Sequence, residues 1–138
     1  MAISFLSLMV SLGLAHQAYA QANAPVEAKD NFENRQADLI TLSGQLGTLH
    51  RLHQICAQAG NLGGNLDLFR GRMTELIALE RPMTRTQRDM QSQFDENYRA
   101  ASRLHLVCGE EALTALQREA TTALIITERL YAPFRISE

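Results

Sequence analysis

Two six-residue segments of this 138-residue chain resemble each other and contain both of its cysteines. Residues 51–56 read RLHQIC and residues 103–108 read RLHLVC, so Cys56 and Cys108 stand at the same place in each segment. A histidine precedes each cysteine by three positions, and on a helix such side chains project from the same face. The two segments are therefore compatible with a disulfide, a metal site or a redox pair.

The first 20 residues have the pattern of a secretory signal peptide. Residues 2–14 are apolar apart from serines and one glycine, a stretch too short to span a bilayer. Ala18 and Ala20 place small residues at the −3 and −1 positions of a cleavage site before Gln21. No Lys or Arg precedes the apolar stretch. We predict export by a cleavable signal peptide to an oxidising compartment, the bacterial periplasm.

The mature chain has the length of one domain with a modest core. Its charges are mixed in sign, the formal net charge of the chain is −2, and no basic block occurs. This argues against nucleic-acid binding, which requires a clustered basic face. We predict no membrane span in the mature chain. We divide the chain into a signal peptide (1–20), a flexible leader (21–30) and a single helical domain (31–138).

Apolar residues at three- and four-residue spacing predict four helices. They are expected over 31–59, over 66–80, from Thr84, and from Glu110 until Pro133. Thr84 with Gln87 has the pattern of a capping box. Gly44 and Gly47 inside the first helix indicate the close approach of a neighbouring helix. Short loops make consecutive helices antiparallel, so we predict an all-α, four-helix up-down bundle.

The two cysteines constrain this bundle further. In an up-down order the first and third helices run parallel, so Cys56 and Cys108 reach the same end. A disulfide needs a Cα separation of about 5.5 Å, which a diagonal pair of helices in a square bundle does not offer. A short, peripheral second helix removes this obstacle. An oxidising compartment and two lone cysteines favour a Cys56–Cys108 disulfide that links the first and third helices.

The alternative is a tetrahedral zinc site made by His53, Cys56, His105 and Cys108. It requires two thiolates, which oxidation to a disulfide removes. The chain has no haem-attachment motif, no phosphate-binding glycine loop and no recognisable Ser/His/Asp order. We therefore predict no metal, no cofactor and no catalytic residues.

A further set of residues resembles a small, uncharacterised alphaproteobacterial family of exported proteins, a domain of unknown function with two characteristic cysteines. The likeness covers about residues 38–131. The residues that carry it are Leu46, Gly47, Leu49, His50, Leu52, Cys56, Phe69, Arg70, Met73, Glu75, Leu76, Phe94, Tyr98, Arg99 and Cys108. The resemblance implies a periplasmic or envelope setting and no established activity.

Two aromatic–arginine pairs, Phe69-Arg70 and Tyr98-Arg99, are of the kind that anchors protein interfaces. If the second and third helices adjoin, these pairs form the floor and the charged rims of a groove. We predict a non-catalytic periplasmic interaction or adaptor protein of the cell envelope, which docks a periplasmic protein or cell-wall component. The plainer alternative places both aromatic rings in the core and both arginines in solvent.

Two other functions stay open at this point. A small helical-bundle enzyme acting on an anionic substrate would need Arg70, Arg99 and Glu75 in one deep polar pocket. A periplasmic helical stress chaperone is suggested by residues 113–117 (LTALQ) and 83–87 (MTRTQ), which resemble the Leu-Thr-x-x-Gln repeats of such proteins. A chaperone would require an exposed hydrophobic surface.

Overall fold

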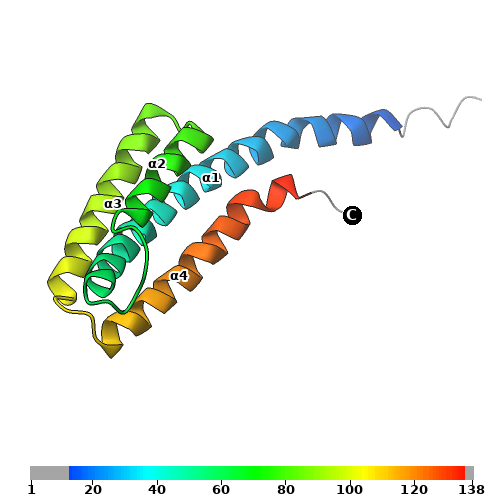
Figure 1. The fold of residues 1–138 in the computed structure, drawn as a ribbon. Coiled ribbons are helices and arrows are strands. Elements are labelled where there is room, and N and C mark those ends of the chain that lie inside the picture. Colours follow the sequence, from blue (N-terminus) through cyan, green and yellow to red (C-terminus); the bar gives the residue numbers. More distant parts are fainter. Residues whose placement is uncertain (1–12, 136–138) are drawn as a thin grey trace, which may run out of the picture. The chain divides into compact units, whose positions relative to one another are not determined.

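The computed structural model describes the backbone of residues 13–135 and the side chains of residues 26–135 (Figure 1). The predicted signal peptide up to residue 12 therefore lies outside the described residues, as do the side chains around its cleavage site. The chain divides into two compact units, Met1–Asn34 and Arg35–Glu138. No described helix has the length and apolar character needed to cross a bilayer.

The described part of the first unit belongs to helix α1, which comprises Gly13–Gln58 and begins earlier than expected. Residues 21–30, predicted as a flexible leader, are helical. Alanine and other strong helix formers dominate this stretch, and they outweigh the N–H lost at Pro25. Residues 26–34 are all exposed, and Lys29 pairs with Glu33 one turn on at 3.7 Å. Helix propensity rather than packing accounts for this segment.

The second unit contains the rest of α1 and three further helices. They are α2 (Leu68–Glu80), α3 (Thr84–Leu104) and α4 (Glu110–Tyr131), followed by the short 3-10 helix η1 (Ala132–Phe134). Figure 1 shows α2 and α3 along one side of α1 and α4 along the other. The predicted all-α, four-helix bundle is confirmed, and α2 is the shortest of its four helices, as expected.

The part of α1 from Leu39 onward is the central helix of this unit. The predicted stripe is buried at Leu39, Leu42, Leu46 and Leu49, and so is Leu52 on another face. Burial extends around most of the helix because α2, α3 and α4 all pack against it. Its buried side chains include the polar ones of Ser43, His50 and His53, so this helix is surrounded without being apolar all round.

The core has two parts, one in the body of the bundle and one around the disulfide. The first joins all four helices: Leu39, Leu42, Leu46, Leu49, Met73, Leu76, Met90, Phe94, Ala123, Ile126 and Leu130. The second joins the end of α1 to the start of α4: Leu52, Ile55, Cys56, Ala112 and Ala115, with Leu62, Cys108 and Leu116 packed against them. The small alanines let α4 approach α1 beside the disulfide.

The predicted disulfide is present, with Cys56 and Cys108 at a Cα separation of 4.8 Å. Cys108 does not lie on α3, however, because α3 ends at Leu104. It lies in residues 105–109, which we call the connector. The segment is not helical, and it runs from the end of α3 towards the end of α1. The chain leaves the helix before Cys108, and this lets the sulfur reach α1.

The expected close approach at the two α1 glycines is also present. A Cβ atom at Gly47 would overlap the backbone carbonyl of Phe94 on α3. One at Gly44 would come within 2.8 Å of the Asn97 amide nitrogen. The backbones of α1 and α3 can touch here only because position 47 carries no side chain.

The predicted end of α2 is confirmed, and the predicted cap at the start of α3 is wrong. α2 ends before Arg81-Pro82 as predicted, with Arg81 in the left-handed region (φ 46°). α3 begins at Thr84, but the predicted capping box is absent: the capping residue is Met83 and no side chain caps the helix. The first helical bond instead runs from the Gln87 N–H to the Met83 carbonyl at 2.9 Å.

Arg35 of α1 joins this helix to the C-terminal ends of α2 and α4. Its guanidinium donates to both carboxylate oxygens of Glu80 at 2.9 and 2.7 Å and to the Leu130 carbonyl at 2.6 Å. It also lies 5.1 Å from the centre of the Phe134 ring. The Glu80 side chain is only 7% exposed, so Arg35 neutralises a charge that has lost most of its water.

Replacing both cysteines by serine should lower the stability of the domain. The bond closes a loop across a sequence separation of 52 residues, for which the chain-entropy model gives about 4 kcal/mol. Urea unfolding with and without reductant measures the loss in the native protein. The mass of the non-reduced protein should be two daltons lower than that of the reduced one, and equal masses would contradict the bond.

Replacing Gly47 by alanine should destabilise the bundle by about 1–3 kcal/mol, because the added methyl group must push α1 away from α3. Gly71 on α2 is the matched control, since a Cβ there meets open space. Gly71→Ala should stabilise by about 0.5–1 kcal/mol through helix propensity. Urea unfolding compares the two, and equal effects would argue against a tight α1–α3 contact.

Candidate functional site

A cleft of about 280 Å³ lies between α2 and α3. Its lining residues are Arg70, Met73, Thr74, Ile77, Gln91, Phe94 and Asp95. The apolar members form a buried or half-buried floor, and the polar members are exposed along the rims. A groove with an apolar floor and charged rims therefore lies between the second and third helices, but Arg70 is the one residue of the two predicted aromatic–arginine pairs that lines it.

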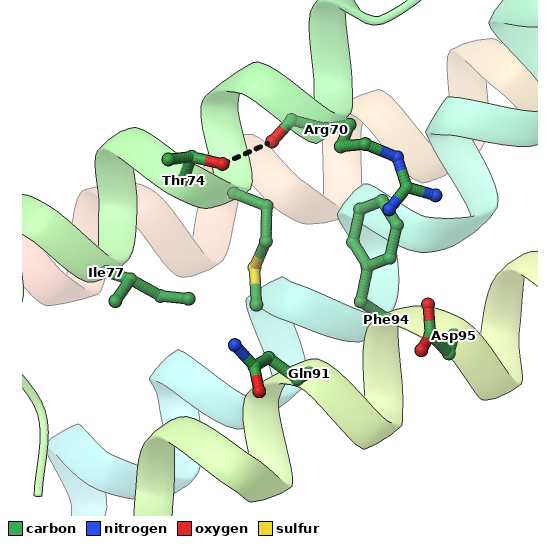
Figure 2. A pocket seen from close by; sticks show the side chains of 7 residues that line it. Arg70, Thr74, Ile77, Gln91, Phe94 and Asp95 are labelled. Atoms are coloured by element: carbon green, nitrogen blue, oxygen red, sulfur yellow. Dashed lines mark hydrogen bonds between the residues drawn. The ribbon is translucent and has the colours of Figure 1, made fainter. Parts of the chain in front are cut away.

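Arg70 is the cation of this cleft, and Figure 2 shows its guanidinium above the ring of Phe94. The guanidinium carbon lies 5.3 Å from the ring centre, a cation–π distance. In the described part of the chain, Arg70 forms no ion pair within 4.0 Å. An arginine at this distance from an aromatic ring can still offer the N–H groups of its planar fork to a carboxylate.

Two buried histidines of α1 lie on the inner side of the cleft floor. His50 is 1% exposed, with its ring 5.7 Å from Phe94 and 5.4 Å from Tyr98. His53, one turn on, is 6% exposed and packs edge-on against Phe69 at 5.5 Å. Neither Nδ1 atom has a hydrogen-bond partner among the described residues.

Burial lowers the pKa of His50 from its ordinary value of 6.5. The positive charge of Arg70 lowers it further, and His53 adds a smaller effect in the same direction. Asp67 opposes them by favouring the protonated ring. The fold therefore disfavours protonation of the His50 imidazole, and the charge that acts on it most strongly, that of Arg70, belongs to the cleft.

The structure separates the four residues predicted as interaction anchors. Arg70 lines the cleft, but Phe69 packs on His53. Tyr98 packs on His50, and its hydroxyl donates to the Gln54 side-chain oxygen at 3.0 Å. Both aromatic rings thus face α1. Arg99 is exposed and lines another hollow of α3, with Glu96, Asn97, Ala100 and Arg103.

The arrangement expected for an enzyme with an anionic substrate is absent among the described residues. Arg70, Glu75 and Arg99 line three different hollows. Glu75 instead pairs with Arg72 at 2.7 Å. The reason is helical geometry: five residues correspond to about 140° of rotation, so Glu75 points away from the face that carries Arg70.

The four-ligand metal alternative is not formed either. The disulfide uses both sulfurs, and the ring of His53 packs against Phe69. His105 lies in the connector, where its carbonyl accepts a hydrogen bond from Arg51 at 3.3 Å. Across the described residues, no three His, Cys, Asp or Glu side chains are placed to hold a metal ion.

Arg70 is the one lining residue of the cleft that the sequence predicts as a site residue. Those not predicted are His50, behind the floor, and the lining residues Met73, Thr74, Ile77, Gln91, Phe94 and Asp95. His50 had a signal, since it stands three residues before His53 and shares a helix face with it. Gln91 and Asp95 are ordinary exposed helix residues in sequence. Only the position of α2 beside α3 makes them part of a cleft.

The lowered pKa of His50 should make stability depend on pH. Below about pH 6.5 the unfolded chain binds a proton that the folded state resists. Stability is thus complete above that pH and falls as the pH drops towards the folded-state pKa. Unfolding free energies in urea at pH 8 and pH 5 should differ more for the native protein than for His50→Gln. An unchanged difference would show that His50 is not the group responsible.

Comparisons with known proteins identify the family. No curated protein and no solved structure matches the chain. A family model described as a protein of unknown function (DUF2385) matches residues 34–134. The match contains both cysteines, the connector and the whole cleft, and it confirms the expected domain of unknown function. This chain belongs to the DUF2385 family.

Proposed function

We propose that this protein is a non-catalytic interaction protein of the alphaproteobacterial cell envelope, which binds a partner polypeptide in the α2–α3 cleft. The observation that carries the proposal is Arg70, stacked on Phe94 beside an apolar floor and without an ion pair within residues 26–135. Arginine and aromatic side chains in such a setting are the usual anchors of protein interfaces.

Export to the periplasm is supported by two separate features. The first is the signal-peptide pattern, with its small residues before Gln21. The second is the disulfide, which joins the chain's two cysteines. Structural disulfides persist in oxidising compartments and are rare in the cytosol.

The size and chemistry of the cleft indicate its occupant. About 280 Å³ falls at the lower end of small-molecule sites, so it accommodates a few side chains rather than a whole substrate. Met73 and Ile77 offer an apolar surface, and methionine adapts to varied shapes. Arg70 favours a carboxylate beside that surface. The occupant is therefore a segment in which an acidic residue stands next to apolar ones.

The enzyme alternative has lost its geometric basis, because Arg70, Glu75 and Arg99 do not converge. Binding of a cell-wall component is a different outcome of the same test. A cell-wall fragment is rich in sugar hydroxyls, which would need more hydrogen-bonding side chains than Thr74 and Gln91 provide. The buried methionine and phenylalanine of the floor fit an apolar side chain better.

Affinity capture from periplasmic extract tests the proposal, with Arg70→Ala and Arg99→Ala as matched variants. Both arginines are exposed helix residues, and only Arg70 lines the cleft. Arg70→Ala should reduce the captured partner at least tenfold, about 1.4 kcal/mol of binding free energy. Arg99→Ala should capture it as well as the native protein does.

Three results would contradict parts of this proposal. Equal capture by both variants would exclude the cleft as the docking site. If purified peptidoglycan binds the native protein but not Arg70→Ala, and no protein is captured, the ligand is a cell-wall component rather than a polypeptide. Full rescue by Arg70→Lys would argue against a bidentate carboxylate contact, since lysine supplies the charge without the planar fork.

A further inference from the structure

The last residue of α3 and the connector that follows it expose three large apolar side chains. Leu104 and Val107 are each 76% exposed, and Leu106 is 74% exposed. Cys108 ties this segment to Cys56, and Arg51 bonds its His105 carbonyl. The exposure therefore belongs to a segment fixed at two points. Apolar side chains gathered in this way on a fixed surface commonly mark an interaction site.

A hollow of about 650 Å³ adjoins these side chains, between the connector and the first turns of α4. Its lining residues are Leu104, His105, Glu110, Glu111, Thr114, Ala115 and Arg118. Because Leu104 belongs to both features, the apolar projection and the hollow share one face. This combination allows a second molecule to place an apolar side chain in the hollow while its own surface covers the exposed apolar side chains of the connector.

The charges on this face of α4 are arranged symmetrically. Glu111 and Arg118 lie seven residues apart, almost two turns, and so point in nearly the same direction. Thr114 and Ala115 stand midway between them and are small; Thr114 is exposed, whereas Ala115 lies at the edge of the face, buried against α1. Ile125, 53% exposed, continues the same row seven residues further on. The row thus carries an acid, a small centre, a base and an exposed apolar residue.

We propose that this face binds a second copy of the chain in a two-fold symmetric dimer. An antiparallel crossing of the two α4 helices, centred between Thr114 and Ala115, places Glu111 of each copy opposite Arg118 of the other. The same register brings the connector of each copy to the level of Ile125 on the other. A two-fold interface must be complementary to itself, and this row fulfils that condition for both charge and apolar surface.

Charge also favours a second copy over a lipid surface. Glu110 and Glu111 border the apolar projection, and carboxylates at this position oppose approach to anionic lipid. Arg118 already bonds its neighbour Glu119 at 2.9 Å, yet its side chain is 68% exposed. With five donors on its guanidinium, it can hold Glu119 and a carboxylate of the second copy together.

The size of the face sets the expected affinity. Stable interfaces bury about 800 Å² per partner, and a few connector side chains with one row of α4 fall short of that area. We therefore expect a reversible dimer that assembles in the micromolar range rather than an obligate one. This inference is independent of the α2–α3 cleft, because none of the residues that line that cleft lines this face.

Sedimentation velocity over a range of protein concentrations tests the dimer. The native protein should shift from monomer to dimer as concentration rises. Leu106→Ser should weaken the dimer at least tenfold. Leu124→Ser is the matched control, because Leu124 is 60% exposed on a different face of α4 and should leave the dimer intact. A native protein that stays monomeric at the highest concentration would overturn the proposal.

A charge exchange tests the register itself. Glu111→Arg and Arg118→Glu should each weaken the dimer by placing like charges opposite each other, and the double variant should restore it. No restoration in the double variant would reject the antiparallel register. A last experiment measures binding to vesicles that contain phosphatidylglycerol. If the monomer binds them and Leu106→Ser does not, the face contacts a membrane rather than a second copy.

Discussion

The burial of most sides of α1 from Leu39 onward is the constraint on which the rest of this structure depends. Where this helix packs against three others, its polar side chains lose contact with water and need other partners. Ser43 meets this demand by bonding the Leu39 carbonyl at 2.8 Å, and Arg35 meets it through Glu80 and Leu130. His50 packs between Phe94 and Tyr98, where burial lowers its pKa and so favours the uncharged ring. The contacts of Arg35 and His50 also fix the positions of the helices around α1.

The disulfide and the exposed connector have a common origin in that geometry. The chain leaves α3 after Leu104 and crosses towards Cys56, and this brings Cys108 to the central helix. Along this crossing the side chains of Leu106 and Val107 point into solvent. If α3 had continued as a helix through these residues, one face of it would have been buried. The covalent bond therefore stabilises the fold and, at the same time, holds apolar side chains in solvent at a cost in hydration free energy. An interface that covers them would recover that cost.

Sequence patterns predicted the helices and the disulfide well because both depend on local spacing and on cysteine count. Gly47 also showed its role in sequence, since a glycine inside a helix lowers helix stability unless a neighbouring backbone needs the space. The cleft was only half predictable. Periodicity placed Phe69 and Tyr98 on apolar faces but did not reveal that those faces look towards α1, which left Phe94 for the cleft floor. The connector was missed because apolar residues at helical spacing also suit a continued helix, and only the disulfide distance rules that out.

Arg70 links the surface of the molecule to its interior. The same guanidinium that lies on Phe94 in the cleft helps to keep the pKa of His50 low behind that ring. A carboxylate bound at Arg70 would offset its charge and make protonation of His50 less unfavourable. Linkage is reciprocal, so protonation of His50 would in turn favour a bound carboxylate. If a carboxylate binds at Arg70 as proposed, the charge state of His50 and the occupancy of the cleft are linked through the charge of that arginine.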